Sequence, residues 1–424
     1  MSTILTHFKT LTQLPHCSQD ATKLLAFLVD FAKERGYRVL VDDAENILLS
    51  KGTPTLCLQA HYDMVCMGKA PQIETYEEEG WLYANNASLG ADNGMAIAMM
   101  MQLMDEGREI ECLLTSDEEI GLIGANAVAF DLQSRFMLNL DSEEEGEVYI
   151  GCAGGVDIVA SKQDSYTKAE GVCYEVAVKG LMGGHSGVDI DKGIESAIKV
   201  LGAYLHTHHI TQLASLYAGE RRNAIASNAV AIVYSQEVLT SQGEVTVRPL
   251  VERPLILSEG HRVIEMIAYF KQGVHAYNHT MEIPEVSINL AIITTDEQGG
   301  ISIESSARAM SAEGLAHLFD EMVAFFESYG LEVSLEDKYP AWRPDISAFT
   351  HLVSEEMQEV FGSSRLKAIH AGLECGVIAQ KYPQITFASI GPTIRYPHST
   401  REAVKLDSVE RTFSVVERII KRLG

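Results

Sequence analysis

The sequence has few basic residues for its size. It carries 33 Lys and Arg against 59 Asp and Glu over 424 residues, a formal net charge of −26. A protein that binds along a nucleic acid needs a basic surface, and so does one that docks on an anionic membrane. The composition therefore predicts neither kind of partner. Because 46% of the residues are hydrophobic and only 22% are charged, the acidity does not indicate disorder.

Cysteine pairs at metal-binding spacing and long apolar runs are also missing. The seven cysteines include no CxxC pair, so the sequence predicts neither a disulfide framework nor a thiolate zinc site. The longest apolar helical stretch, residues 94–104, is far shorter than the ~20 residues of a membrane span. The first residues indicate an amphipathic helix and not a signal peptide. We therefore expect a protein of a reducing compartment, the cytoplasm.

Strands alternate with helices in the first part of the chain. Helices are expected over residues 18–36 and 92–106, and apolar strands over 55–60, 110–115 and 136–140. Strands that alternate with helices are typical of βαβ units, which build a mainly parallel sheet with flanking helices.

The middle of the chain follows another pattern, which predicts an α+β module with an antiparallel sheet. Its expected strands are 172–178, 229–234, 286–293 and 301–305, and its expected helices are 193–208, 255–272 and 312–329. After a Pro-containing segment at 339–344 the α/β pattern returns, with helices at 347–361, 374–381 and from about 408. We therefore expect an α/β catalytic domain over residues 1–165 and 340–424, into which a second module, residues 166–339, is inserted.

Carboxylates and histidines follow the apolar strands of the α/β part. In order, they are His61 and Asp63, Asp117 to Glu119, Asp141 and, after a Gly-Pro turn, His398. Ligands of an open parallel sheet bind outside the carboxyl ends of its strands, so we expect these side chains to meet there. Asp92, at the start of the 92–106 helix, could lie at the same edge.

So many carboxylates at one edge would repel each other unless cations neutralised them. Histidine and carboxylate ligands suit divalent transition metals, zinc first. One bridging acid, with two further acids and two histidines, could hold two metals about 3.5–4 Å apart, the spacing of two-metal hydrolases. Each feature alone is more often a surface charge run, a His–Asp contact or a helix cap. Their joint arrangement favours a metal site.

These residues resemble the five metal-site motifs of the co-catalytic zinc peptidases, the family that contains carboxypeptidase G, tripeptidase T, aminoacylase and carnosinase. The motifs are HYD at 61–63, GADNG at 90–94, TSDEEIG at 115–121, NLD at 139–141 and PHS at 397–399. The stretches GGHSG at 183–187, RNAI at 222–225, HAGLECG at 370–376 and GP at 391–392 are similar to the bacterial aminoacyl-histidine dipeptidase branch, which cleaves Xaa-His and other dipeptides.

The resemblance implies two divalent metal ions, zinc first, with manganese or cobalt as alternatives. His61 and Asp141 would bind one ion, Glu119 and His398 the other, and Asp92 would bridge them.

The resemblance also implies roles for residues beside the metal ligands. Glu118 would be the general base that takes a proton from the attacking water and gives it to the leaving amine. Asp63 would orient the His61 ring. The peptide bond between Asp92 and Asn93 would be cis.

The inserted domain would be the family's lid, through which such proteins dimerise. His185 resembles the lid histidine that polarises the scissile carbonyl, often in the partner subunit's site. Arg308 resembles the arginine that grips the substrate's free carboxylate, and Asn223 and His370 would be further substrate contacts. The alternatives are a glycine-rich turn with an exposed His185 and a surface arginine at the end of a strand.

The sequence therefore predicts a cytoplasmic, homodimeric metallopeptidase that hydrolyses dipeptides. An N-acyl amino acid deacylase or another aminopeptidase on the same scaffold is the first alternative; for the deacylase, an acyl group would replace the N-terminal residue. A binding protein that has kept the fold without catalysis is the second. The sequence lacks neither the base nor any metal ligand, which argues against the second alternative.

Overall fold

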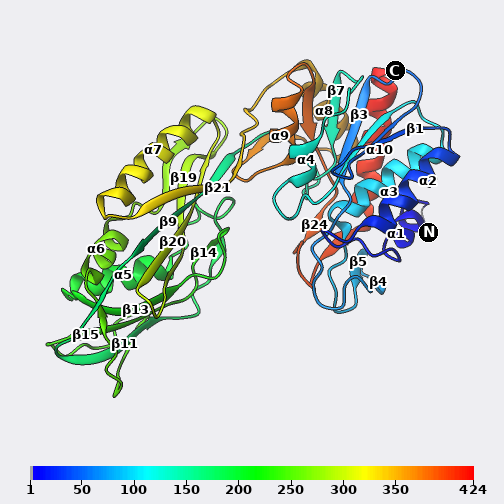
Figure 1. Ribbon diagram of the computed structural model, residues 1–424. Helices are drawn as coiled ribbons and strands as arrows, with labels where there is room; N and C mark the ends of the chain where they lie inside the picture. Colours follow the sequence, from blue (N-terminus) through cyan, green and yellow to red (C-terminus); the bar gives the residue numbers. More distant parts are fainter. Residues whose placement is uncertain (1–2) are drawn as a thin grey trace. The chain divides into compact units, whose positions relative to one another are not determined.

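The computed structural model describes residues 3–424, which form two compact units (Figure 1). The first unit contains the chain up to Cys152, together with Trp342–Ala368 and Leu373–Gly424, and the second contains Ala153–Ala341 and Ile369–Gly372. The chain enters the second unit before residue 166, because strand β9 (Gly154–Gln163) pairs with strands of that unit on both sides.

The first unit is built on a mixed sheet with the strand order β1-β2-β6-β3-β7-β23-β8-β22. Its strands are β1 (Arg38–Val41), β2 (Ile47–Ser50), β3 (Leu56–His61), β6 (Glu111–Thr115), β7 (Phe136–Asn139), β8 (Glu147–Cys152), β22 (Arg365–Ile369) and β23 (Thr386–Ser389). The four central strands β6, β3, β7 and β23 are parallel, while β1, β2 and β8 pair antiparallel. The predicted α/β fold class is confirmed.

The central strands are apolar because both faces of the sheet are covered. Every residue of β3 and β6 is buried, as is typical of parallel strands between layers of helices. The helices of this unit are α1 (Thr3–Leu11), α2 (Thr22–Glu34), α3 (Ala91–Asp105), α4 (Ile123–Ala127), α8 (Ala348–Phe361), α9 (Glu374–Lys381) and α10 (Leu406–Leu423). Helix α3 packs on β3, and α8 and α9 pack on β8 and β23.

A small antiparallel sheet completes the first unit. Its strands are β4 (Thr75–Glu78), β5 (Trp81–Ala84), β24 (Ile394–Arg395) and β25 (Ala403–Lys405). It ties the turn after β24 to the rest of the unit, because β25 pairs with both β24 and β5. Within residues 3–424, no helix is long and apolar enough to cross a membrane.

The second unit is an antiparallel sheet with three helices, as the middle of the sequence predicts. Its strand order is β16-β11-β15-β13-β19-β20-β9-β21, and β18 also pairs with β19. Besides β9, the strands are β11 (Val172–Val178), β13 (Gln212–Ala218), β15 (Ala229–Ser235), β16 (Val245–Pro249), β18 (Gly273–Asn278), β19 (Ile283–Thr295), β20 (Gly300–Ala309) and β21 (Glu332–Tyr339).

The helices of the second unit share one hydrophobic core with its sheet. They are α5 (Ala197–Thr207), α6 (Gly260–Tyr269) and α7 (Ala312–Ser328). Two short strand pairs lie outside the large sheet: β10 (Tyr166–Thr167) with β17 (Ile256–Leu257), and β12 (Gly184–His185) with β14 (Ala224–Ile225).

The helix predicted over residues 255–272 is too long. Ile256 and Leu257 instead form β17, buried against β10, and the helix is confined to α6. Gly273 has a positive φ of 103° and begins β18. Tertiary strand pairing at both ends thus overrides the local helical pattern.

The segment before α2 also differs from the prediction. Helix α2 begins at Thr22 and not near Ser18, and a disulfide joins Cys17 to Cys66, whose Cα atoms are 5.5 Å apart. The prediction of a chain without disulfides is therefore wrong for these two cysteines. They are separated by 49 positions, and only the folding of the segment before α2 onto the loop after β3 brings them together. Among the described residues, the other five cysteines are free and buried.

Candidate metal centre and substrate-binding residues

The predicted metal ligands of the first unit meet at the carboxyl edge of its parallel strands. His61 is the last residue of β3, Glu118 and Glu119 follow β6, and Asp141 follows β7. These three strands are neighbours in the sheet. Because their carboxyl ends all point the same way, residues far apart in the sequence converge at one edge.

Asp92 lies in the first turn of α3, where the backbone is not yet helical (φ −82°, ψ 106°). Its peptide bond to Asn93 is cis, as the resemblance implied. The Asn93 side chain donates a hydrogen bond of 3.0 Å to the carbonyl of Leu140, which ties the start of α3 to the end of β7.

The Asp92 carboxylate stands between the two histidines. Its Oδ1 is 3.1 Å from His61 Nε2 and its Oδ2 is 3.1 Å from His398 Nε2. The same His61 nitrogen is 3.4 Å from Asp141 Oδ1, and the His398 nitrogen is 2.9 Å from Glu119 Oε2. Two ligand sets therefore share Asp92, and within each set the possible ligand atoms lie within 4.8 Å of one another.

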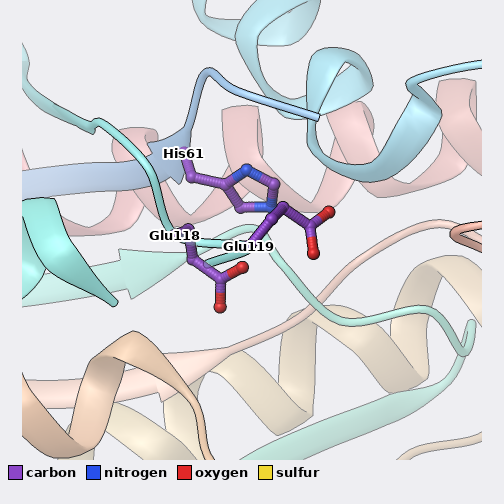
Figure 2. Close-up of side chains that lie close together, drawn as sticks. All are labelled: His61, Glu118 and Glu119. Carbon is purple, nitrogen blue, oxygen red and sulfur yellow. The ribbon is translucent and has the colours of Figure 1, made fainter. Parts of the chain in front are cut away.

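Glu118 and Glu119 are adjacent, yet their carboxylates point in different directions beside His61 (Figure 2). His61, Glu118 and Glu119 form a third set of possible ligand atoms within 4.8 Å. Of the two, Glu119 is the one that contacts His398. The turn after β6 can therefore offer one carboxylate as a ligand and keep the other for a separate task.

Burial and mutual repulsion shape the charge states of this cluster. Burial, followed by the charges of Asp141 and Glu119, raises the pKa of Glu118 well above its usual range. Burial alone would lower the pKa of His398, but its hydrogen bonds to Asp92 and Glu119 raise it to about 11. Without a bound cation, protonated imidazoles of His61 and His398 are the positive partners that these carboxylates contact, whereas an imidazole nitrogen that binds a metal ion carries no proton.

The donor set fits divalent cations. Each of the two sets that share Asp92 offers one imidazole nitrogen and two carboxylates, a combination suited to zinc, manganese or cobalt. Within the described residues, the buried Oε1 of Glu119 has no hydrogen-bond partner. A buried carboxylate oxygen without a partner is costly, and a bound cation would remove that cost.

Asp63 holds the turn after β6 close to His61. Its Oδ1 accepts a hydrogen bond of 2.9 Å from the Glu118 amide and lies 3.6 Å from His61 Nδ1. The Ser18 hydroxyl donates to its Oδ2 at 2.7 Å. The Asp63 carboxylate therefore contacts the backbone of Glu118 and lies beside the His61 ring.

His185 lies in the second unit, on the short strand β12. Its Nδ1 accepts hydrogen bonds from the amides of Gly187 and Val188 at 3.1 and 3.2 Å, which leaves the proton on Nε2. Strand β12 pairs with β14, so His185 lies opposite Ala224 and beside the exposed Asn223. Within the glycine-rich stretch, Gly184 and His185 form a short strand and the residues that follow form a turn, whose amides hold the His185 ring.

Arg308 is buried on β20, with only 6% of its surface exposed. Its guanidinium donates to the hydroxyls of Tyr339 and Ser186, and its Nε has no hydrogen-bond partner in residues 3–424. No carboxylate of the described chain forms an ion pair with it. The surface-arginine alternative is wrong, because β20 is an interior strand between β19 and β9.

His370 joins the same cluster. Its Nε2 is 2.7 Å from the hydroxyl of Ser287, which lies opposite Arg308 in the β19–β20 register. Burial and the charge of Arg308 lower the pKa of His370 to about 3, so its ring is neutral. Its buried Nδ1 has no partner among the described residues. The cluster thus combines one buried cation with neutral polar groups.

Sequence reasoning missed a polar ladder, a row of buried side chains that are hydrogen-bonded to one another and join β3, β6 and β7 to α9. Gln59 of β3 accepts from Asn139 of β7 at 2.5 Å and donates to Glu374 of α9 at 2.5 Å. Thr115 also donates to Glu374, at 2.8 Å. A polar glutamine within the apolar run of β3 was the signal that could have revealed the ladder, since buried polar side chains need partners.

Comparison with known proteins agrees with this geometry. Residues 57–422 match Peptidase family M20/M25/M40. The chain is 30% identical to the cytosol non-specific dipeptidase of Escherichia coli (strain K12), over 98% of this chain and 96% of that protein.

Solved structures show the same fold. The aminoacylhistidine dipeptidase of Vibrio alginolyticus superposes with a TM-score of 0.83 at 27% identity, over 99% of this chain and 96% of that chain. A tripeptidase from Staphylococcus aureus superposes with a TM-score of 0.62 at 17% identity, over 99% and 98% of the two chains, a likeness of fold alone.

Proposed function

Because this chain belongs to peptidase family M20/M25/M40, we propose that it hydrolyses dipeptides, Xaa-His among them, with two divalent cations. The observation that carries the proposal is the Asp92 carboxylate, each of whose oxygens faces a different histidine at 3.1 Å. The names of the E. coli and V. alginolyticus relatives, both dipeptidases, support the substrate class.

The ligand sets divide the cluster in two. His61 and Asp141 would hold one cation, Glu119 and His398 the other, and Asp92 would contact both. Zinc is the first candidate, with manganese or cobalt as alternatives. Two such cations would neutralise the carboxylates and activate a water molecule for attack on the peptide carbonyl.

Glu118 is the proposed proton carrier. It lies beside His61 and Glu119, and its backbone is held by Asp63. A carboxylate whose pKa is raised by burial and like charges can accept a proton from water and return it to the leaving amine. Asp63 would act through His61 and Glu118 by positioning them.

The second unit supplies the proposed substrate contacts. Arg308 would bind the free carboxylate of the dipeptide, since a buried guanidinium with neutral partners favours an anion with planar geometry. His185, with its proton on Nε2, would donate to the scissile carbonyl oxygen. Asn223 and His370 would contact the remainder of the peptide.

We propose a homodimer formed through the second unit and a cytoplasmic location. The resemblance stated above supports the first. The name of the E. coli relative, a cytosol enzyme, supports the second, whereas the Cys17–Cys66 disulfide is a bond that a reducing cytoplasm disfavours.

The test uses cation-free protein that is refilled with Zn²⁺, Mn²⁺ or Co²⁺ and assayed with Xaa-His dipeptides, other dipeptides, tripeptides and N-acetyl amino acids. We expect hydrolysis of dipeptides only after refilling, with little turnover of tripeptides. Faster hydrolysis of N-acetyl amino acids would assign the chain as a deacylase instead. A refilled protein that binds dipeptides without cleaving them would contradict the proposal.

A further inference from the structure

Glu402 is a buried carboxylate that the proposed reaction does not use. Only 3% of its surface is exposed. It accepts hydrogen bonds from four consecutive backbone amides: Oε2 from Leu89 and Gly90 at 2.8 and 3.1 Å, and Oε1 from Ala91 and Asp92 at 2.8 and 3.3 Å. Among the described residues it forms no ion pair with a basic side chain. Its carboxylate oxygens therefore have backbone amides as their partners.

The four amides converge because of the backbone at Gly90. This residue is in the left-handed region (φ 69°, ψ 27°), directly before the first turn of α3. Successive amides around such a residue turn to one side and form a concave site for an anion. Here the chain's own carboxylate fills that site, and it does so at the turn that presents Asp92.

Glu402 also belongs to the segment that presents the other histidine. It follows His398 by four positions, and its amide donates to the carbonyl of Ser399 at 3.1 Å. The next residue, Ala403, begins β25, which pairs with β5. One end of the Glu402 side chain is thus fixed to the His398 turn, and the other end to the Asp92 turn.

We propose that Glu402 is a positioning residue that sets the cation affinity of the centre by fixing Asp92 between His61 and His398. The inference rests on the proposed function, because it assumes that cations bind to these three residues. The four hydrogen bonds hold the start of α3 at a set distance from the His398 turn.

The alternative is that Glu402 only satisfies the amides at the start of a helix, as any cap does. Glu111 provides the matched control. It is also a buried carboxylate, 1% exposed, and it accepts the amides of Gln133 and Ser134 at 3.2 and 3.1 Å. It begins β6, whereas the metal-centre residues follow the other end of that strand.

The experiment compares Glu402→Gln with Glu111→Gln by competition for Zn²⁺ against a chromophoric chelator, with urea unfolding measured in parallel. The amide of glutamine keeps the shape of the side chain but can accept at only one end, so it loses about half of these hydrogen bonds. We expect Glu402→Gln to weaken Zn²⁺ binding by roughly 10-fold to 100-fold. Glu111→Gln should lower the free energy of unfolding and leave the affinity for Zn²⁺ unchanged.

Wild-type Zn²⁺ affinity in folded Glu402→Gln would overturn the inference, and so would an equal loss of affinity in Glu111→Gln. If Glu402→Gln does not fold, Glu402→Asp replaces it. This variant keeps the charge on a shorter side chain, and we expect a smaller but measurable loss of affinity. Wild-type affinity in that variant would then overturn the inference. A wild-type protein that binds no Zn²⁺, Mn²⁺ or Co²⁺ would instead overturn the proposed function, and the inference with it.

Discussion

At the residue scale, Glu118 and Glu119 are adjacent and chemically identical, but their surroundings differ. Glu119 contacts His398, and its second oxygen is buried without a partner in residues 3–424. Glu118 has a raised pKa and, within the described residues, forms no ion pair with either histidine. The turn after β6 thus gives two adjacent glutamates different surroundings, which supports the different roles proposed for them.

The first prediction concerns Glu118→Gln. Because Glu118 is proposed to move a proton and not to bind a cation, we expect the variant to keep its cations and to lose at least about 100-fold in kcat. The measurements are cation content after dialysis and kcat with a dipeptide.

Glu119→Gln is the matched comparison, since the two residues are adjacent. We expect this variant to lose cation affinity first, and activity as a consequence. Wild-type turnover by Glu118→Gln, or a loss of cations equal to that of Glu119→Gln, would contradict the assignment.

The second prediction concerns Arg308→Ala. Loss of a buried guanidinium that pairs with a carboxylate should cost about 2 kcal/mol, roughly a 30-fold rise in KM for dipeptides. Dipeptides with an amidated C-terminus lack that carboxylate, so their KM should change little.

Arg248→Ala is the control for Arg308→Ala. Arg248 is also an arginine of the second unit, but its side chain is 68% exposed and pairs with Glu175 at the surface. We expect no change in KM from this variant. If Arg308→Ala raises the KM of free and amidated dipeptides equally, the proposed contact between Arg308 and the substrate carboxylate is wrong.

At the element scale, the segment before α2 is anchored next to the metal centre. The amide of Ser18 donates to the carbonyl of Met64 at 3.2 Å, and its hydroxyl donates to Asp63 at 2.7 Å. The amide of Gln19 donates to Asp117 at 2.6 Å. The Cys17–Cys66 disulfide closes this region covalently.

The third prediction concerns that disulfide. Denatured, unreduced protein should show five reactive thiols, and reduced protein all seven. Cross-linking two cysteines separated by 49 positions restricts the unfolded chain. The double variant Cys17→Ser, Cys66→Ser should therefore lose up to about 4 kcal/mol of unfolding free energy.

Urea unfolding with and without a dithiol reductant measures that loss. The reductant should destabilise the wild type and leave the double variant unchanged. Cys173 is a free and buried cysteine of the second unit. The variant Cys173→Ser should therefore be destabilised by the reductant as much as the wild type is. Seven reactive thiols in the unreduced protein would contradict the prediction.

At the scale of the whole molecule, the proposed chemistry is divided between the two units. The cation ligands and Glu118 belong to the first unit, whereas His185, Arg308 and His370 belong to the second. The proposed dimer and the proposed role of His185 in a partner's site can therefore be tested together.

The fourth prediction is that light scattering gives twice the chain mass of 46.5 kDa. Mixing His185→Ala with Glu118→Gln subunits should restore activity, because each mixed dimer can combine an intact Glu118 with an intact His185. With random exchange, about a quarter of wild-type activity is expected. A monomeric mass would contradict the dimer, and mixing without recovery would place His185 in its own subunit's site.

The sequence by itself determined the elements with strong patterns. Helix α9 lies where it was predicted, and β3, β6 and β7 lie within about a residue of their predicted limits. Apolar runs between polar breaks define such strands locally. The candidate residues after these strands could be named as well, because chain order and parallel pairing together place strand ends at one edge.

Only the tertiary structure decided what depends on distant partners. Cys17 meets Cys66, Glu402 meets the amides of residues 89–92, and Gln59 meets Glu374 across long separations in sequence. Periodicity describes a residue's own element and carries no information about such partners. The sequence thus determined which side chains are present at the ends of the strands, and folding decided which of them contact one another, because a hydrogen bond or disulfide depends on distances that only the folded chain sets.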